Sequence, residues 1–269
     1  MQKRQGAGGT SKSMVEARKV YFDNNFFDHW LISHQDQGKD FAGRFRSAGW
    51  VWCLSDDLLR ELLVPGNERF VSQYMQCFLP LLAQSLVCRN AGQVVREELR
   101  GQRVQPFEFH EALTPLRGFL EEIASGNFSR MNRIWSLSDQ WRNSDQQLKR
   151  ELEHARQRGA RRLKLERFLF LKIRQHLISL QVENPEEEAN RMLSNLHMFP
   201  HLRTHSMVAY ELSYRSFRVQ GMCDLRHLVH AVDADVLVTD DKWMKEIAEQ
   251  LFHGNPMVWT REVFFKALN

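Results

Sequence analysis

The chain has 269 residues, a formal net charge of +4, and a hydrophobic content of 43% that includes seven Trp and eighteen Phe. This length suits one large domain or a small domain with a big insertion, and the apolar content excludes a globally disordered protein. The mild positive charge is compatible with a polyanionic partner without establishing one.

Signals for a membrane span, for secretion and for a structural zinc site are all missing from the sequence. No apolar run approaches the roughly 20 residues that cross a bilayer, and the basic first residues have no apolar region behind them. We therefore expect a cytoplasmic protein with no membrane partner and a flexible tail over residues 1–14. The four cysteines are scattered without metal-binding spacing, as in reduced thiols: Cys53, Cys77, Cys88 and Cys223.

The N-terminal part of the chain predicts alternating strands and helices. Residues 19–23 (KVYFD) form a short apolar strand that ends in turn residues, and residues 50–54 (WVWCL) form a second β-rich run. Ser55 then caps a helix that stops before Pro65 and the glycine after it. These segments belong to a predicted core over residues 15–66.

Residues 67–202 predict a different kind of structure. Helical periodicity recurs along this stretch and almost no strand signal interrupts it. Breaks between the helices fall at glycine, proline and asparagine residues. We therefore expect a large, all-helical insertion here.

The C-terminal part, residues 203–269, returns to the alternation of the N-terminal part. A helix is expected to begin at Asp224, followed by the strand DVLVT, the helix DKWMKEIAEQLF, the strand PMVWT and a terminal helix REVFFKAL. Helices that alternate with short apolar strands imply a parallel sheet. The predicted fold class is α/β, with one parallel sheet built from both ends of the chain and interrupted by the helical insertion.

Acidic residues stand where several of these elements begin or end. Asp23 closes the first strand and Asp241 follows DVLVT, so the two should face each other at the carboxyl edge of the sheet. Glu61 and Asp224 lie on helices that could reach the same crevice. Four carboxylates this close repel one another, and a divalent cation would remove the conflict. Oxygen ligands favour Mg²⁺ or Mn²⁺ over zinc.

Taken in order, VYFDNN, SDDLLRELL and DLRHLVHAVDADVLVTDD resemble the PIN-domain nuclease family. The resemblance implies a PIN-like sheet and a metal-dependent endoribonuclease that hydrolyses RNA phosphodiester bonds with one or two Mg²⁺ or Mn²⁺ ions. The positions that match the family's metal-binding and catalytic acids are Asp23, Glu61, Asp224 and Asp241.

Neighbouring residues take supporting roles in this interpretation. Asn25 and Thr239 match further positions of the family pattern and would orient the carboxylates. His227, one turn after Asp224, stands where some relatives carry another acid, and a neutral imidazole could bind a metal or a phosphate. Asp240 competes with the next aspartate for the ligand role. The Thr-x-Asp spacing favours the later residue and leaves Asp240 to cap the following helix.

Each candidate also has a purely structural explanation. Asp23 could begin an Asx turn, Glu61 could be an ordinary exposed helix residue, and the other two acids could be helix N-caps. His227 and His230 are three residues apart on one helix, so they could form a zinc-like cluster with Asp224. No further soft ligand stands nearby to complete such a cluster.

A basic stretch within the insertion allows two interpretations. Residues 149–174 carry ten Lys or Arg against three Glu. They form either a solvated helix face, with pairs such as Arg162 and Glu166, or a basic lip that holds a phosphate backbone. The candidate RNA-binding residues are Arg158, Arg161, Arg162 and Lys164.

The sequence therefore supports one leading function and two alternatives. The leading function is an RNA-cleaving nuclease close to bacterial toxins or phage-defence nucleases, with an inhibitor or activator protein to restrain it. In the first alternative, an inactive PIN-like RNA-binding or scaffold protein acts through its helical insertion. In the second, a helical sensor assembles with a partner or as a homo-oligomer.

Overall fold

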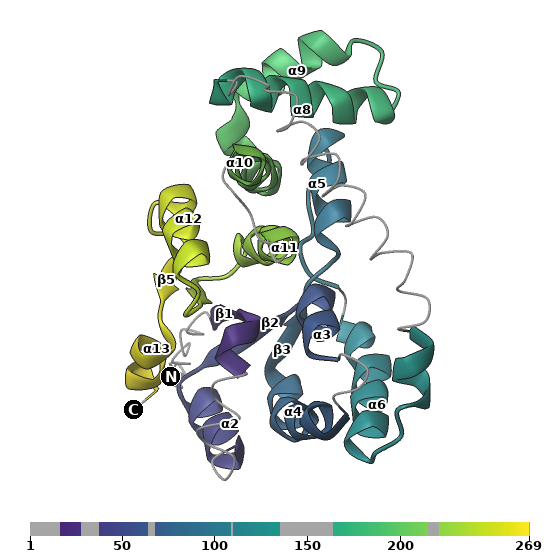
Figure 1. The fold of residues 1–269 in the computed structure, drawn as a ribbon, viewed down its shortest axis with the longest axis vertical. Coiled ribbons are helices and arrows are strands. Elements are labelled where there is room, and N and C mark those ends of the chain that lie inside the picture. Colours follow the sequence, from purple (N-terminus) through teal and green to yellow (C-terminus); the bar gives the residue numbers. More distant parts are fainter. Residues whose placement is uncertain are drawn as a thin grey trace, which may run out of the picture.

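The computed structural model describes residues 17–27, 38–63, 68–108, 110–134, 164–214 and 221–268. These residues form an α/β fold in which helices flank a five-stranded, fully parallel sheet of order β3-β2-β1-β4-β5 (Figure 1). The strands are β1 (Arg18–Phe22), β2 (Trp50–Leu54), β3 (Ser85–Val87), β4 (Val236–Val238) and β5 (Met257–Trp259).

The central strand β1 explains how the sheet is built from both ends of the chain. Val20 lies opposite Trp52 of β2 on one side and opposite Val236 of β4 on the other. All three side chains are buried, as expected for a parallel sheet that is covered on both faces. Side chains alternate along the strand, so Phe22 joins one hydrophobic core and Tyr21 joins the core on the other face.

Helices cover each face of this sheet and supply the rest of the two cores. One core contains side chains from α2 (Gly38–Ser47), α3 (Asp56–Leu62), α4 (Glu68–Leu81), α6 (Leu113–Ala124) and α13 (Arg261–Ala267). The other contains side chains from α5 (Ala91–Leu99), α8 (Leu165–Ser179), α9 (Pro185–Ser194), α10 (Pro200–Tyr214), α11 (Gly221–Ala231) and α12 (Lys242–Phe252). None of the described helices has both the length and the apolar character that crossing a bilayer requires.

Shorter helical pieces connect these elements. Residues 24–27 and 129–134 are helical. Single 3₁₀ turns are η1 (Leu82–Gln84), η2 (His110–Ala112) and η3 (Leu196–Met198). The turn η1 leads directly into β3, so the chain passes from helix to sheet without a loop.

One strand lies in the range that the sequence predicts to be all helical. Residues 85–87 (SLV) form β3, with Ser85 opposite Trp52 and Val87 opposite Leu54. Residues 67–202 therefore contain an edge strand of the sheet, and the sheet continues past residue 66. A strand of three residues is too short to show an alternating pattern, and pairing with β2 selects its conformation.

The helix that carries Asp224 begins earlier than its sequence suggests. α11 starts at Gly221, so Asp224 lies in the first turn of the helix and is not its N-cap. The expected cap before α3 is confirmed, because Ser55 Oγ accepts a hydrogen bond from Leu58 N at 3.1 Å. The four strands that the sequence predicts, 19–23, 50–54, 235–239 and 256–260, overlap β1, β2, β4 and β5.

Candidate metal centre

Asp23 and Thr239 meet at the carboxyl edge of the sheet, where β1 and β4 are neighbours. The backbone N–H of Asp23 donates to Val238 O at 3.0 Å, which continues the pairing of the two strands. The Thr239 hydroxyl donates to Asp23 Oδ2 at 2.9 Å across 216 residues of sequence. The strand order reverses between β1 and β4, and open α/β sheets bind ligands at such a point.

The Asp23 carboxylate is held in place by its neighbours. It is only 3% exposed, and its Oδ2 also accepts a hydrogen bond from Asn25 Nδ2 at 3.1 Å. Thr239 Oγ1 in turn accepts the backbone N–H of Asp241 at 3.0 Å. Asn25 and Thr239 therefore make the carboxylate contacts that the sequence predicts for them.

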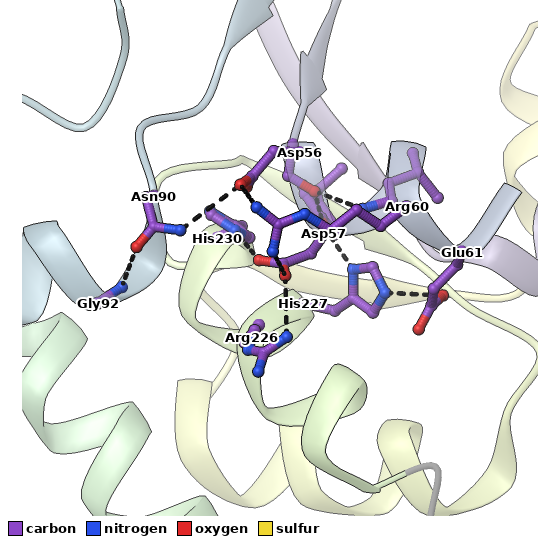
Figure 2. A network of polar contacts seen from close by, with 12 residues as sticks. Asp56, Asp57, Arg60, Glu61, Asn90, Gly92, Arg226, His227 and His230 are labelled. Atoms are coloured by element: carbon purple, nitrogen blue, oxygen red, sulfur yellow. Dashed lines mark hydrogen bonds and ion pairs between the residues drawn. The ribbon is translucent and has the colours of Figure 1, made fainter. Parts of the chain in front are cut away.

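Glu61 and His227 bring two helices to the same place. Glu61 lies on α3 and His227 on α11, and their side chains point toward each other with Oε2 and Nε2 3.0 Å apart (Figure 2). One ligand atom each from Asp23, Glu61 and His227 lies within 4.8 Å of the others. These three residues could hold a metal ion.

Asp224 and Asp241 belong to the same electrostatic environment without joining that tight group. Burial and the charge of Asp23, with smaller contributions from Asp241 and Glu61, raise the pKa of Asp224 to about 7, whereas the charge of His227 opposes the shift. Asp241 is the N-cap of α12 and accepts the Met244 N–H at 2.8 Å. The structure thus gathers all four predicted acids around one edge of the sheet.

The pKa values of the buried groups reflect this crowding of carboxylates. Burial raises the pKa of Asp23, and the charge of Glu61 adds to the effect, whereas His227 and the hydrogen bond from Thr239 oppose it. Burial lowers the pKa of His227, but its hydrogen bond with Glu61 and the charges of Glu61 and Asp23 raise it to about 9. The surrounding carboxylates therefore favour the positively charged form of His227.

A buried tyrosine contacts the ring nitrogen of His227 that faces away from Glu61. Tyr21 OH lies 2.6 Å from His227 Nδ1 and 2.7 Å from Ser55 Oγ, which is also the cap of α3. Because Nδ1 is engaged by Tyr21, Nε2 is the ring nitrogen that faces Glu61. The sequence prediction did not include Tyr21. Its only signal is the alternation along β1, which sends it to the opposite face from Phe22.

A second polar network lies beside the first, between the same two helices (Figure 2). Asp57 is 2% exposed, and its carboxylate lies 3.0 Å from His230 Nε2 and 3.3 Å from a guanidinium nitrogen of Arg226. Burial raises the pKa of Asp57, but the hydrogen bond and charge of His230 and the charge of Arg226 lower it to about 2.

In this second network, arginine side chains already pair with the carboxylates. Asp56, Asp57 and His230 have ligand atoms close enough for a metal, but Arg60 also pairs with Asp56 at 2.8 Å and lies 3.7 Å from Asp57. The guanidinium groups thus already supply the positive charge that the carboxylates need. The spacing of Asp57 to Glu61 and of His227 to His230 was the available signal for these two carboxylate–imidazole pairs.

Two further interpretations of the sequence can be compared with the structure. His227 and His230 contact separate carboxylates, so the two imidazoles do not form with Asp224 the zinc-like cluster that the sequence disfavours. Asp240 does not cap α12, because its carboxylate accepts the Arg261 N–H at 3.1 Å at the start of α13. The Asp240 carboxylate also lies 3.5 Å from Arg261 Nε, so it pairs with the first residue of α13.

The predicted RNA-binding residues lie largely beyond the part of the chain that the structure describes. Arg158, Arg161 and Arg162 are outside the described residues, and so is the pairing expected between Arg162 and Glu166. Lys164 is exposed and immediately precedes α8. The basic lip therefore stays a prediction.

Comparisons of the chain with protein-family models, with curated proteins and with solved structures give no match. No family is assigned to the chain by similarity. The chemistry open to the site follows from its own side chains, which are buried carboxylates and an imidazole at the edge of a parallel sheet.

Proposed function

We propose that this chain is a metal-dependent nuclease with a PIN-like core that hydrolyses phosphodiester bonds in RNA. The observation that carries the proposal is the convergence of Asp23, Glu61 and His227 at the point where the strand order reverses. Asp224 and Asp241 add two more carboxylates next to these residues, on the side from which a phosphate group would enter the site. The choice of RNA over DNA follows from the resemblance of the sequence to PIN nucleases.

The donor set fits a divalent ion. Two carboxylates offer the hard oxygen ligands that Mg²⁺ and Mn²⁺ prefer. The imidazole of His227, once it has released its proton, adds a nitrogen that Mn²⁺ accepts more readily than Mg²⁺. Asp23 is buried beside Glu61, and burial of two neighbouring carboxylates is costly unless a cation compensates them. We therefore propose Mn²⁺ or Mg²⁺ as the cofactor, with Mn²⁺ preferred.

The side chains of the site position the ion and the substrate. When bound, a divalent ion polarises the phosphate and lowers the pKa of a coordinated water. Thr239 and Asn25 hold the Asp23 carboxylate in one orientation, and His227 does the same for Glu61. Asp23 and His227 are buried whereas Asp224 and Asp241 are partly exposed, so the site opens to solvent on the side of Asp224 and Asp241.

Cleavage by the purified full chain tests this proposal. End-labelled tRNA, rRNA and single-stranded DNA are incubated with Mn²⁺ or with EDTA, using the wild type, Asp23→Asn and the exposed control Asp40→Asn. We expect Mn²⁺-dependent cleavage of RNA that falls at least ~100-fold in Asp23→Asn and is unchanged in Asp40→Asn. Equal rates for wild type and Asp23→Asn, or intact RNA in every reaction, would contradict the proposal.

The biological setting that we propose is a toxin or phage-defence effector under the control of an inhibitor or activator protein. Induced expression in bacteria should then stop growth with the wild type and not with Asp23→Asn. An inactive RNA-binding scaffold would instead leave growth unaffected and bind no Mn²⁺ at Asp23 and Glu61 in calorimetry. The two measurements together separate an enzyme from a scaffold.

A further inference from the structure

A cavity of about 450 Å³ lies beside α3 and α11, which contribute Arg60 and Arg226 to its wall. Its walls come from five helices, which are α3, α5, α8, α10 and α11. This volume is in the range of sites that hold small molecules. The residues of the cavity wall play no part in the candidate metal centre.

All the ionisable side chains on the wall of this cavity are Arg or His. Five of its residues are Arg or His, and no Asp or Glu of the described chain lines it. Arg96 is exposed and forms no ion pair within the described residues. The basic residues of the wall are Arg60, Arg96, His176, His205 and Arg226.

Burial is the main cause that lowers the pKa of both histidines of the wall, and neighbouring positive charges add to it. Burial and the charges of His176, Lys172 and Arg226 lower the pKa of His205 to about 4. Its Nδ1 is shielded from solvent and has no hydrogen-bond partner in the described part of the chain. The N-terminal end of α5, at Ala91, also lines the cavity and adds the positive end of a helix dipole. The positive end of α5 and the positive charges around His205 favour an anion.

We propose that this cavity binds the phosphate group of a nucleotide, either free or within a nucleic-acid chain. Guanidinium groups pair with phosphate through two parallel hydrogen bonds. Arg96 is the arginine of the wall that would make this contact, whereas Arg60 and Arg226 also pair with Asp56 and Asp57. Val95, Leu99 and Leu180 form an apolar part of the same wall, against which a base or ribose can pack.

The cavity shares its two central helices with the candidate metal centre. Arg60 directly precedes Glu61 on α3, and Arg226 is two residues after Asp224 on α11. Both arginines contact Asp57. The second polar network, around Asp57, therefore lies between the cavity and the carboxylates of the candidate metal centre. Binding in the cavity needs neither a metal ion nor cleavage, and it stands whether or not the chain is a nuclease.

Calorimetry with the full chain in EDTA tests the proposal independently of any metal or cleavage. The probes are ADP, adenosine, inorganic phosphate and a ten-nucleotide RNA. The test variant is Arg96→Glu, and the matched control is Arg100→Glu, which makes the same charge change at an exposed position just beyond α5 and outside the cavity wall.

We expect ADP to bind, adenosine to bind at least ~10-fold more weakly, and Arg96→Glu to weaken ADP at least ~10-fold relative to Arg100→Glu. Binding of the RNA in place of ADP, with the same difference between the variants, supports the proposal and identifies a nucleic-acid chain as the source of the phosphate. Absence of binding for ADP, phosphate and RNA, or equal affinities for the two variants, would overturn it.

Discussion

The carboxylate of Glu61 and the imidazole of His227 lie 3.0 Å apart although 166 residues separate them in the chain. This contact joins a helix of the N-terminal part to a helix of the C-terminal part, next to the buried carboxylate of Asp23. A hydrogen bond between a carboxylate and an imidazole orients both groups. The two side chains therefore hold each other in place at the site.

Mn²⁺ should stabilise the folded chain, because the proposed ligands come together only in the native state. At a free Mn²⁺ concentration about 100 times its Kd, the gain is about 2.7 kcal/mol, and it appears as a higher unfolding temperature. Glu61→Gln should lose most of this gain, since an amide is a weak metal ligand but can still hydrogen-bond His227. Scanning calorimetry with and without Mn²⁺ measures it. The control is Glu249→Gln on the surface of α12, and an equal Mn²⁺ shift in both variants would contradict metal binding at Glu61.

Thr239→Val should weaken Mn²⁺ binding by roughly 10- to 100-fold, because valine removes the hydroxyl that orients Asp23 and accepts the Asp241 N–H. Thr239→Ser keeps that hydroxyl and should restore binding. Thr260→Val is the matched control, since it removes the N-cap of α13 at a cost of about 1 kcal/mol in stability without touching the acids. Titration calorimetry with Mn²⁺ decides the outcome, and an affinity of Thr239→Val equal to that of Thr260→Val would exclude the proposed role.

Asp57→Ala should destabilise the chain by about 3 kcal/mol or more, because it leaves Arg226 and His230 facing each other without their shared carboxylate. Asp56→Ala is the matched change one residue earlier. Its side chain is 39% exposed, so we expect a loss of only about 0–1 kcal/mol. Urea denaturation of both variants compares them directly. Similar midpoints would show that the buried network contributes little to stability.

The stability of the fold should decrease at alkaline pH through His201. Burial lowers the pKa of His201, but hydrogen bonds with Asp233 and Glu98, each at 2.7 Å, raise it to about 9. The folded pKa lies above the unfolded value of 6.5, so this stabilisation is fully present below about pH 6.5 and is lost as the pH rises through 9.

Replacement of the imidazole removes this pH dependence. Between pH 7 and 10 the free energy of unfolding of the wild type should fall by a few kcal/mol, which lowers its unfolding temperature. The unfolding temperature of His201→Gln should change less over the same range. The exposed His197 lies on the nearby turn η3, and His197→Gln should retain the wild-type profile. Parallel profiles for wild type and His201→Gln would rule out this origin of the pH effect.

Four of the five strands could be predicted from the sequence because their side chains form short apolar runs bounded by turn and capping residues. Buried parallel strands need such runs, and the capping hydroxyl of Ser55 marks the next helix without reference to the rest of the chain. Asp23, Asn25, Thr239 and Asp241 could be placed for the same reason, since each lies next to the end of a strand. Local patterns carry this information because the physical causes are themselves local.

Other features depend on contacts between residues that are far apart in sequence. β3 exists because it pairs with β2, and Tyr21 supports His227 across 206 residues. The pairing of Asp57 with His230 and the basic cavity beside α5 likewise depend on how α3, α5 and α11 pack. Spacing along a chain sets which side of a helix or strand a residue occupies, but it does not set which partner lies opposite. Packing of the two cores on either face of the sheet chooses those partners, because burial leaves few arrangements in which every polar group is satisfied.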